Sequence, residues 1–350
     1  MFQLQLTTTA HTKLGHILVM MLLLPLASQL PDSVWSADSL PPIDFVIAGI
    51  RHHFENIDRA SGVISLNQSV EPKLLDVLNA QTGGGIEATE AWTYFWYIDS
   101  PNLFLSMAPG NPKLVGGKRL SRHVMVRNGD KFMAWREYRF PDDPKRSPLL
   151  TGVYGPAQEF MEEELPKSES MKDPRYYGYF RGDKFLGELL ALSRPTTKIL
   201  RTEEFDGAKC VVIEVQRTPG RRSIMWIDME HGFMIRKALE CEYLGNRERT
   251  LEDFAVHSIV GGEGKWLPSK VSTRVTFWNR ETGDNLGSAT IAVTVNRIVI
   301  GNEVPPSIFD ISFPLGTIVS DRFREKEFIV MWSDVETSPA DGHVENKGNE

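Results

Sequence analysis

The sequence predicts a mainly β protein of the α+β class, in which a curled antiparallel sheet forms a half-barrel and helices cover its concave face. Three observations lead to this prediction. Strand-like runs separated by tight turns follow one another from residue 196 to residue 300. Apolar and polar residues alternate along these runs, and an amphipathic helix comes before them.

The tight turns are marked by glycine beside a polar residue or proline. They lie at Asp206-Gly207, Pro219-Gly220, His231-Gly232, Gly245-Asn246, 261–264 and 282–285. This spacing is typical of a meander of about seven strands. The alternation is clear where Val271, Thr273, Val275 and Phe277 oppose Ser272, Arg274 and Thr276. One apolar and one polar, solvent-facing side predict a single sheet covered on one side only. A sheet with this many strands must also twist and curl.

The N-terminal half has its own helix and strand signals. Ile43, Val46, Ile47, Ile50 and Phe54 recur at helical spacing, which predicts an amphipathic helix from Pro41 to Ala60. Asn128-Gly129 is a strong hairpin signal. Strands are expected at Gly62–Val70, Ala91–Asp99, Leu103–Met107, Arg122–Arg127 and Lys131–Tyr138.

The segment from 140 to 194 differs in character, because proline and charged residues are dense in it. Gly155-Pro156 opens a short helical pattern, and a second helix is expected over Lys184–Leu192. We therefore expect a helical insertion near 140–194 within a single domain spanning 37–332. The tail 333–350 is acidic and nearly free of large apolar residues, which predicts disorder.

The N-terminus carries a predicted export signal over residues 1–36. Ile17 to Ala27 is an almost unbroken apolar run, too short to span a bilayer, so a cleaved signal is favoured over an anchor. Val34 and Ser36 suit the small-residue pattern before a cut, which leaves Ala37 as the mature N-terminus. The mature chain is then expected in the periplasm or cell envelope, without a stable membrane span.

Two cysteines in an exported chain raise the question of a disulfide. Cys210 begins one predicted strand, and Cys241 ends the strand two further along the meander. One strand between them places the cysteines about 10 Å apart or more, beyond the Cα separation that a disulfide tolerates. Two buried thiols are predicted instead.

No catalytic constellation, metal site or cofactor site is expected. The net charge of −7 implies no dominant basic face for nucleic acid. Gly117-Lys118 and Gly264-Lys265 lack the spacing of a phosphate loop. His52 and His53 are adjacent on a helix, so their side chains diverge. Asp228, Glu230 and His231 fall at a hairpin turn, where such residues are common for backbone reasons.

Aromatic residues crowd the strand from Trp92 to Tyr97. Alternate rings either fill the core or line a cavity that holds a hydrophobic ligand, and Trp226 and Phe277 carry the same two interpretations. The candidate cavity residues are Trp92, Trp96, Trp226, Val271, Val275, Phe277, Ile291 and Val293.

Several segments together resemble a known family. They are Glu203–Val215 (EEFDGAKCVVIEV), Met225–Ile235 (MWIDMEHGFMI) and Val304–Asp321, which contains the closing Phe309–Thr317 stretch. In this order, after a signal peptide, a helix and an aromatic strand, they resemble the LolA-like superfamily of periplasmic lipoprotein carriers and its uncharacterised relatives. The resemblance implies a curled antiparallel sheet with helices in its concave side, enclosing an apolar cavity that shields acyl chains.

Three functions are weighed. The leading hypothesis is an exported, non-enzymatic binding protein that holds a lipid, a lipoprotein acyl chain or another hydrophobic ligand. The alternative is a cell-envelope interaction or scaffolding module without a ligand. A hydrolase assembled from distant residues such as His123 and His257 is the third, and nothing in their spacing predicts it. Ligand identity and oligomeric state do not follow from the sequence.

Overall fold

The computed structural model describes residues 40–82, 87–100, 102–110, 114–115, 118–157, 175–181, 184–244, 247–262, 264–301 and 304–331. The chain divides into two units between Pro42 and Ile43, and the account below concerns the second. The predicted export signal, its cleavage point and the predicted disordered tail lie outside the described residues. Within these ranges no helix has the length and apolarity to cross a membrane.

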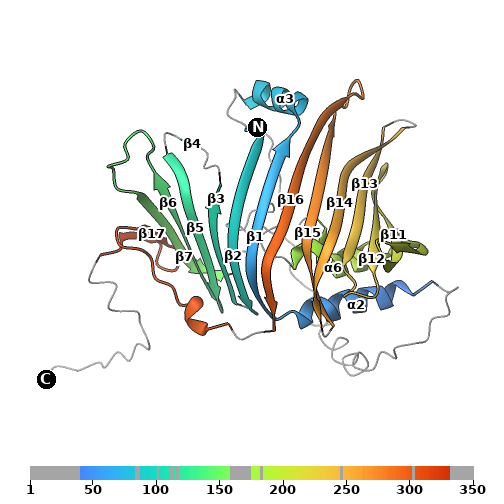
Figure 1. The fold of residues 1–350 in the computed structure, drawn as a ribbon, viewed down its shortest axis with the longest axis horizontal. Coiled ribbons are helices and arrows are strands. Elements are labelled where there is room, and N and C mark those ends of the chain that lie inside the picture. Colours follow the sequence, from blue (N-terminus) through green and yellow to red (C-terminus); the bar gives the residue numbers. More distant parts are fainter. Residues whose placement is uncertain are drawn as a thin grey trace, which may run out of the picture. The chain divides into compact units, whose positions relative to one another are not determined.

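One sixteen-stranded sheet contains nearly all of the strands (Figure 1). Its order is β10-β11-β12-β13-β14-β15-β16-β1-β2-β3-β5-β6-β7-β17-β18, with β4 beside β5. The strands are β1 Arg59–Val70, β2 Thr89–Asp99, β3 Asn102–Pro109, β4 Leu114–Val115, β5 Lys118–Asn128, β6 Lys131–Arg139, β7 Leu149–Pro156, β10 Thr197–Phe205, β11 Ala208–Thr218, β12 Arg221–Asp228, β13 Ile235–Leu244, β14 Arg247–Gly262, β15 Lys265–Trp278, β16 Asn285–Ile300, β17 Ile318–Asp321 and β18 Lys326–Ile329.

In the part of the chain that the structure describes, the helices are few and short compared with the sheet. They are α2 Ile43–Asn56, α3 Pro72–Thr82, α5 Tyr176–Tyr179 and α6 Leu186–Leu192, with 3-10 turns at Arg194–Thr196 and Pro306–Ile308. A small separate sheet joins β8 Phe180–Arg181 to β9 Lys184–Phe185. The predicted fold class is confirmed: the sheet is curled and open, it is antiparallel except where β7 pairs with β17, and helices α2, α5 and α6 pack against one of its faces.

The predicted meander from 196 to 300 is confirmed as the seven strands β10 to β16. The turn between β10 and β11 follows the expected backbone rule. Asp206 and Gly207 have φ angles of 52° and 74°, the positive pair that lets a two-residue turn match the twist of its strands. The Asn128-Gly129 hairpin between β5 and β6 is confirmed as well, with Gly129 at φ 60°.

Parts of the C-terminal and middle segments differ from the prediction. Gly155 and Pro156 end strand β7, Ala157 directly after them is helical, and the rest of the short helix predicted there lies outside the described residues. β7 pairs in parallel with β17, so that Thr151 lies beside Ile318. In the described part of 140–194, helices α5 and α6 follow in the chain, and α6 corresponds to the helix predicted over Lys184–Leu192 but begins at Leu186. The helix α3 and the strands β17 and β18 were not predicted.

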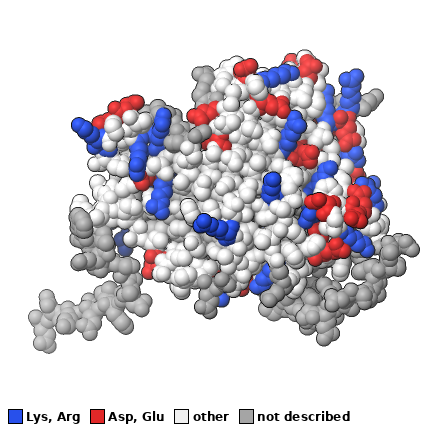
Figure 2. Space-filling view, in the orientation of Figure 1, with Lys and Arg blue, Asp and Glu red and all other residues white. Residues whose placement is uncertain are grey.

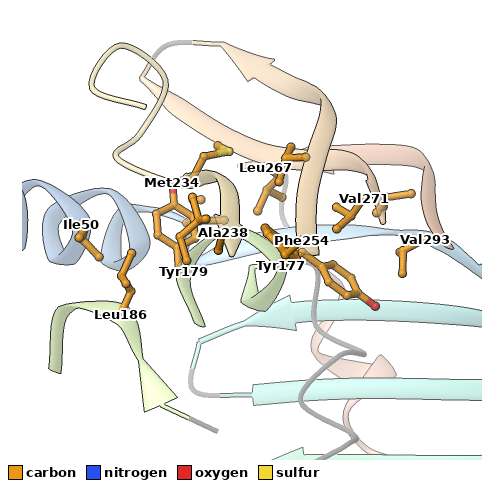
Figure 3. Close-up of a cluster of buried hydrophobic side chains, with 14 of the residues drawn as sticks. Ile50, Tyr177, Tyr179, Leu186, Met234, Ala238, Phe254, Leu267, Val271 and Val293 are labelled. Carbon is orange, nitrogen blue, oxygen red and sulfur yellow. The ribbon is translucent and has the colours of Figure 1, made fainter. Parts of the chain in front are cut away.

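The main core lies on the inner face of the sheet, which we define by Ile64, Trp96, Leu105, Val271 and Val293. Helices α2, α5 and α6 contribute to the same core, and α2 contacts both α6 and β15 while α5 contacts β13 and β15. Figure 3 shows part of this cluster, in which Ile50 of α2 and Leu186 of α6 lie on the side of the helices and Val271 and Val293 lie on the sheet.

The opposite, outer face is not solvent-exposed throughout. This corrects the prediction of a sheet covered on one side only. Val124, Val126 and Trp135 form an outer cluster with Val304 and Phe309. The cause is tertiary, because the chain after β16 returns across β5 and β6 and covers their outer side chains. A second outer cluster contains Ala208, Cys210, Val212 and Trp226.

Candidate ligand-binding face

The structure brings most of the predicted cavity residues together on the inner face. Trp96, Val271 and Val293 are buried in its core. Trp92 and Ile291 are half-buried and pack against that core. Val275 is half-buried, and Phe277, near the end of β15, is 39% exposed.

Trp226 lies on the outer face and is separated from the other seven residues. Its neighbours in β12, Met225 and Ile227, are fully buried in the inner core, so alternation turns the indole outward. There Lys237 Nζ lies 5.2 Å from the ring centroid and the indole N–H donates to Glu203. The aromatic ring of Trp226 suggested a ligand contact. The apolar neighbours Met225 and Ile227, which take the inner face, indicate instead that Trp226 is on the outer face.

An apolar row crosses six neighbouring strands of the inner face. It follows the register Gly62, Trp96, Leu105, Met125, Ala134 and Val153 from β1 to β7. Beside it, Ile64, Tyr94 and Met107 form a second row. Sequence reasoning did not select Leu105, Met107 or Met125, although alternation continued through the two hairpins would have placed them on this face.

Trp96 is the central side chain of the first row. It is fully buried, and its Nε1 donates no hydrogen bond within the described part of the chain. Gly62 lies opposite it, and a Cβ there would be 3.1 Å from the indole Nε1. The missing side chain at Gly62 therefore makes room for the ring. A buried N–H without an acceptor is rare in proteins and requires an explanation.

The inner core is rich in methionine. Met107 and Met125 belong to the apolar rows, while Met225 and Met234 lie under the helices, and all four are at most 4% exposed. Met234 is visible near Tyr179 in Figure 3. Methionine is unbranched and flexible, so a surface of this kind can adapt its shape to another molecule.

Two pockets lie on the outer face and include none of the predicted cavity residues. The first has a volume of about 430 Å³ and is lined by Phe205, Asp206, Lys237, Asp253, Ala255, Val256 and His257. The second, of about 360 Å³, lies against β2, β3 and β5. Figure 2 shows acidic and basic side chains mixed along the top and right of the visible face, with a broad middle area that carries few charges.

Asp228, Glu230 and His231 form the one group of potential metal ligands that we find among the described residues, with ligand atoms within 4.8 Å of one another. Asp228 is buried, and its Oδ1 accepts hydrogen bonds of 2.9 Å from the backbone N–H groups of Glu230 and His231. Its Oδ2 lies 3.0 Å from His231 Nδ1 and 3.5 Å from Arg236. These contacts are those of a side chain that organises a turn.

The side chains of His52, His53, His123 and His257 do not converge on a common site. His52 contacts Asn56, whereas His53 Nδ1 lies 3.0 Å from the Gly264 carbonyl oxygen, so the pair shares no ligand direction. Burial lowers the pKa of His53. His123 lies in β5 and His257 in β14, with several strands of the sheet between them. His257 Nε2 is 2.7 Å from Ser272 Oγ.

Both cysteines are free and buried, as predicted. Cys210 is in β11 and Cys241 in β13, with β12 between them. Burial, together with the Asp228 charge, raises the pKa of Cys210 to about 12. Burial and the hydrogen bond with Glu248 raise the pKa of Cys241 to about 11.

These pKa shifts predict an alkaline loss of stability. Unfolded thiols ionise near pH 9.0, whereas the folded thiols stay neutral to higher pH. Their contribution to the free energy of unfolding is therefore complete below pH 9 and is lost as the pH rises towards 12. We expect neither thiol to react with iodoacetamide at pH 8 in the folded protein and both to react in urea, as checked by mass spectrometry. Rapid labelling of the folded protein would contradict this.

Comparisons with known proteins find solved structures that are similar to this chain at low sequence identity. No protein-family model matches the sequence, and no curated protein is similar to it. A DUF1329 family protein from Desulfovibrio piger is 10% identical over 77% of this chain and 98% of its own, with a TM-score of 0.37. A LolA superfamily protein from Nitrosomonas europaea is 11% identical over 77% and 98%, with the same TM-score.

A third solved structure is a domain from Vibrio parahaemolyticus that is named for outer membrane lipoprotein sorting. It is 11% identical over 76% of this chain and 95% of its own, with a TM-score of 0.37. The sequence segments quoted above resemble the LolA-like superfamily. The curled, open antiparallel sheet with helices on its inner face is the half-barrel which that resemblance implied.

Proposed function

We propose that this chain is an exported, non-enzymatic binding protein that holds a hydrophobic ligand against the inner face of its half-barrel. The ligand class is a lipid, a lipoprotein acyl chain or a similar molecule. The observation that carries the proposal is the apolar row from Gly62 to Val153, with the buried Nε1 of Trp96 at its centre, which has no hydrogen-bond partner among the described residues.

Apolar burial and one hydrogen bond would both contribute to the free energy of ligand binding. Each CH₂ group of an acyl chain that leaves water for this face gains about 0.8 kcal/mol. Trp96 Nε1 adds a donor that an ester or amide carbonyl of the ligand could satisfy. Leaving such a group unpaired costs about 1–3 kcal/mol, so a ligand that carries a carbonyl is favoured over a plain hydrocarbon.

The packing of the face decides how a ligand would enter. Tyr94, Leu105 and Met125 are almost fully buried, so a ligand must displace contacts that they now make. Methionine side chains allow this at low cost, because they have three rotatable bonds and no branch. The proposal is therefore binding with rearrangement of the inner face.

The direct test is lipid extraction and native mass spectrometry of protein purified from an exporting host, followed by titration of the delipidated protein with a fluorescent acyl glycerol. We expect co-purified lipid and saturable binding. Trp96→Phe keeps most of the ring but removes the N–H, and it should weaken binding of the acyl glycerol about fivefold or more. Absence of both bound lipid and saturable binding would disprove the proposal.

A matched control uses a tryptophan whose N–H already has an acceptor. Trp278 Nε1 donates to the Thr250 carbonyl oxygen at 3.2 Å. Trp278→Phe should therefore leave the affinity for the acyl glycerol unchanged. An equal loss in both variants would mean that Trp96 does not contact the ligand, and the carbonyl-directed part of the proposal would be wrong.

The alternative, an interaction module without a ligand, is favoured by one observation. Phe323, Phe328 and Ile329, at the β17–β18 end of the sheet, are 47%, 40% and 51% exposed. A partner that covers these side chains would bury apolar surface at the sheet edge. Partner binding that Phe328→Asp abolishes, in protein that binds no acyl glycerol, would favour this alternative.

A further inference from the structure

The second outer pocket is built from two separate parts of the chain. Its volume is about 360 Å³. The sheet side comes from β2, β3 and β5, and the other side comes from the segment that follows β16. The lining residues are Phe95, Tyr97, Phe104, Ser106, Arg122, Ile308 and Ile311.

Both walls of this pocket are held in place by specific contacts. Tyr97 and Phe104 are register partners in β2 and β3, and their rings meet edge to face at 5.8 Å. Ile308 and Ile311 pack against the outer cluster around Trp135. Asn128 Nδ2 donates to the Phe309 carbonyl oxygen at 3.3 Å, which ties the second wall to the β5–β6 hairpin.

The pocket is apolar with one charge. Arg122 is its only charged lining residue. The Arg122 guanidinium lies 5.4 Å from the centroid of the Trp135 ring, and its Nε donates to Ser106 Oγ at 3.4 Å. Glu137 is the register partner of Arg122, but its carboxylate lies 2.7 Å from Arg139 Nε. Within the described ranges we find no ion pair of Arg122 within salt-bridge distance, although its charge helps to lower the pKa of Glu137.

The rim of the pocket also exposes an aromatic ring. Phe95 is 47% exposed in the middle of β2, between the buried Tyr94 and Trp96. A large side chain at this position extends the apolar lining outward from Tyr97 and Phe104. The pocket thus offers an apolar track with a cation beside it.

We infer that this pocket binds an anionic amphiphile with one hydrocarbon chain, such as a fatty acid. The carboxylate would meet the Arg122 guanidinium, which suits two parallel hydrogen bonds to a carboxylate. The chain would lie between Phe104 and Ile311. The volume is at the small end of the range for small-molecule sites, about 300–1,000 Å³. This site lies on the opposite face of β2 from the proposed inner site and does not depend on it.

Photocrosslinking of the full chain separates the two faces. A dodecanoate with a diazirine on its chain should label Ile308 or Ile311 and Phe95 or Phe104, as assigned by tandem mass spectrometry. In Arg122→Gln the yield at these residues should fall about tenfold, because the charged hydrogen bonds are lost. Arg127→Gln, on the same strand but outside the pocket, should leave the yield unchanged.

The uncharged glycerol ester of the same photoactivatable acid tests the role of charge. Its labelling of Ile308 and Ile311 should be weaker than that of the acid and equal in wild type and Arg122→Gln. Trp96→Phe should not alter the labelling of this pocket by the acid. Labelling confined to Trp96, Leu105 and other inner residues would overturn the inference, as would equal labelling by acid in wild type and Arg122→Gln.

Discussion

Replacement of Asp228 by alanine is expected to destabilise the folded chain by about 3–5 kcal/mol, because it breaks a buried ion pair by removing one partner. The Asp228 side chain is 0% exposed, and Arg236, at 5% exposure, lies 3.5 Å away. Without Asp228, the carboxylate that remains paired with Arg236 among the described residues is Asp206, which is 58% exposed. The backbone N–H groups of Glu230 and His231 would lose their acceptor as well. Urea denaturation followed by circular dichroism measures this loss.

Variants at the same turn separate the charge from the hydrogen bonds. Asp228→Asn keeps an oxygen for the two N–H groups but loses the charge that faces Arg236. Its free energy of unfolding should therefore lie between those of wild type and Asp228→Ala. His231→Ala removes one side-chain partner that is 30% exposed, and it should cost about 1 kcal/mol or less. A loss below 1 kcal/mol in Asp228→Ala would show that Arg236 is stabilised by other groups.

The sequence was informative where local physics determines the structure. Asp206-Gly207 and Asn128-Gly129 close hairpins because their backbones accept positive φ angles. The order of strands β10 to β16 followed from such turns, and with it the separation of Cys210 from Cys241. Period-two alternation placed Trp96, Val271 and Val293 on one face. These features need only contacts between neighbours along the chain.

Features that depend on long-range contacts could not be predicted in the same way. The parallel pairing of β7 with β17 joins Thr151 to Ile318 without a turn between them. The segment with Val304 and Phe309 packs across the outer face, and no periodic pattern in the sequence predicts this packing. The outer pocket and the role of Arg122 depend on that return. That the Trp96 N–H meets no acceptor among the described residues depends on where acceptors lie in three dimensions.

The second large effect is expected for Trp96→Ala, which should lower the free energy of unfolding by about 3–5 kcal/mol. The indole is 0% exposed and is in contact with Gly62 on the neighbouring strand. Its removal leaves a cavity next to Leu105, its register partner in β3. Trp278→Ala, at a partly exposed position, is the control and should cost about 1–2 kcal/mol.

Gly62 gives this prediction a sharper test through a double-mutant cycle. In the wild-type background Gly62→Ala places a Cβ 3.1 Å from the indole, and the crowding should cost about 1–3 kcal/mol. In Trp96→Ala the same methyl group enters the new cavity, so Gly62→Ala should be neutral or stabilising. The double variant should therefore lose less stability than the sum of the two single losses, by about 1 kcal/mol or more. Additive losses would mean that the ring does not lie over Gly62, and the row on which ligand binding is proposed would lose its central contact.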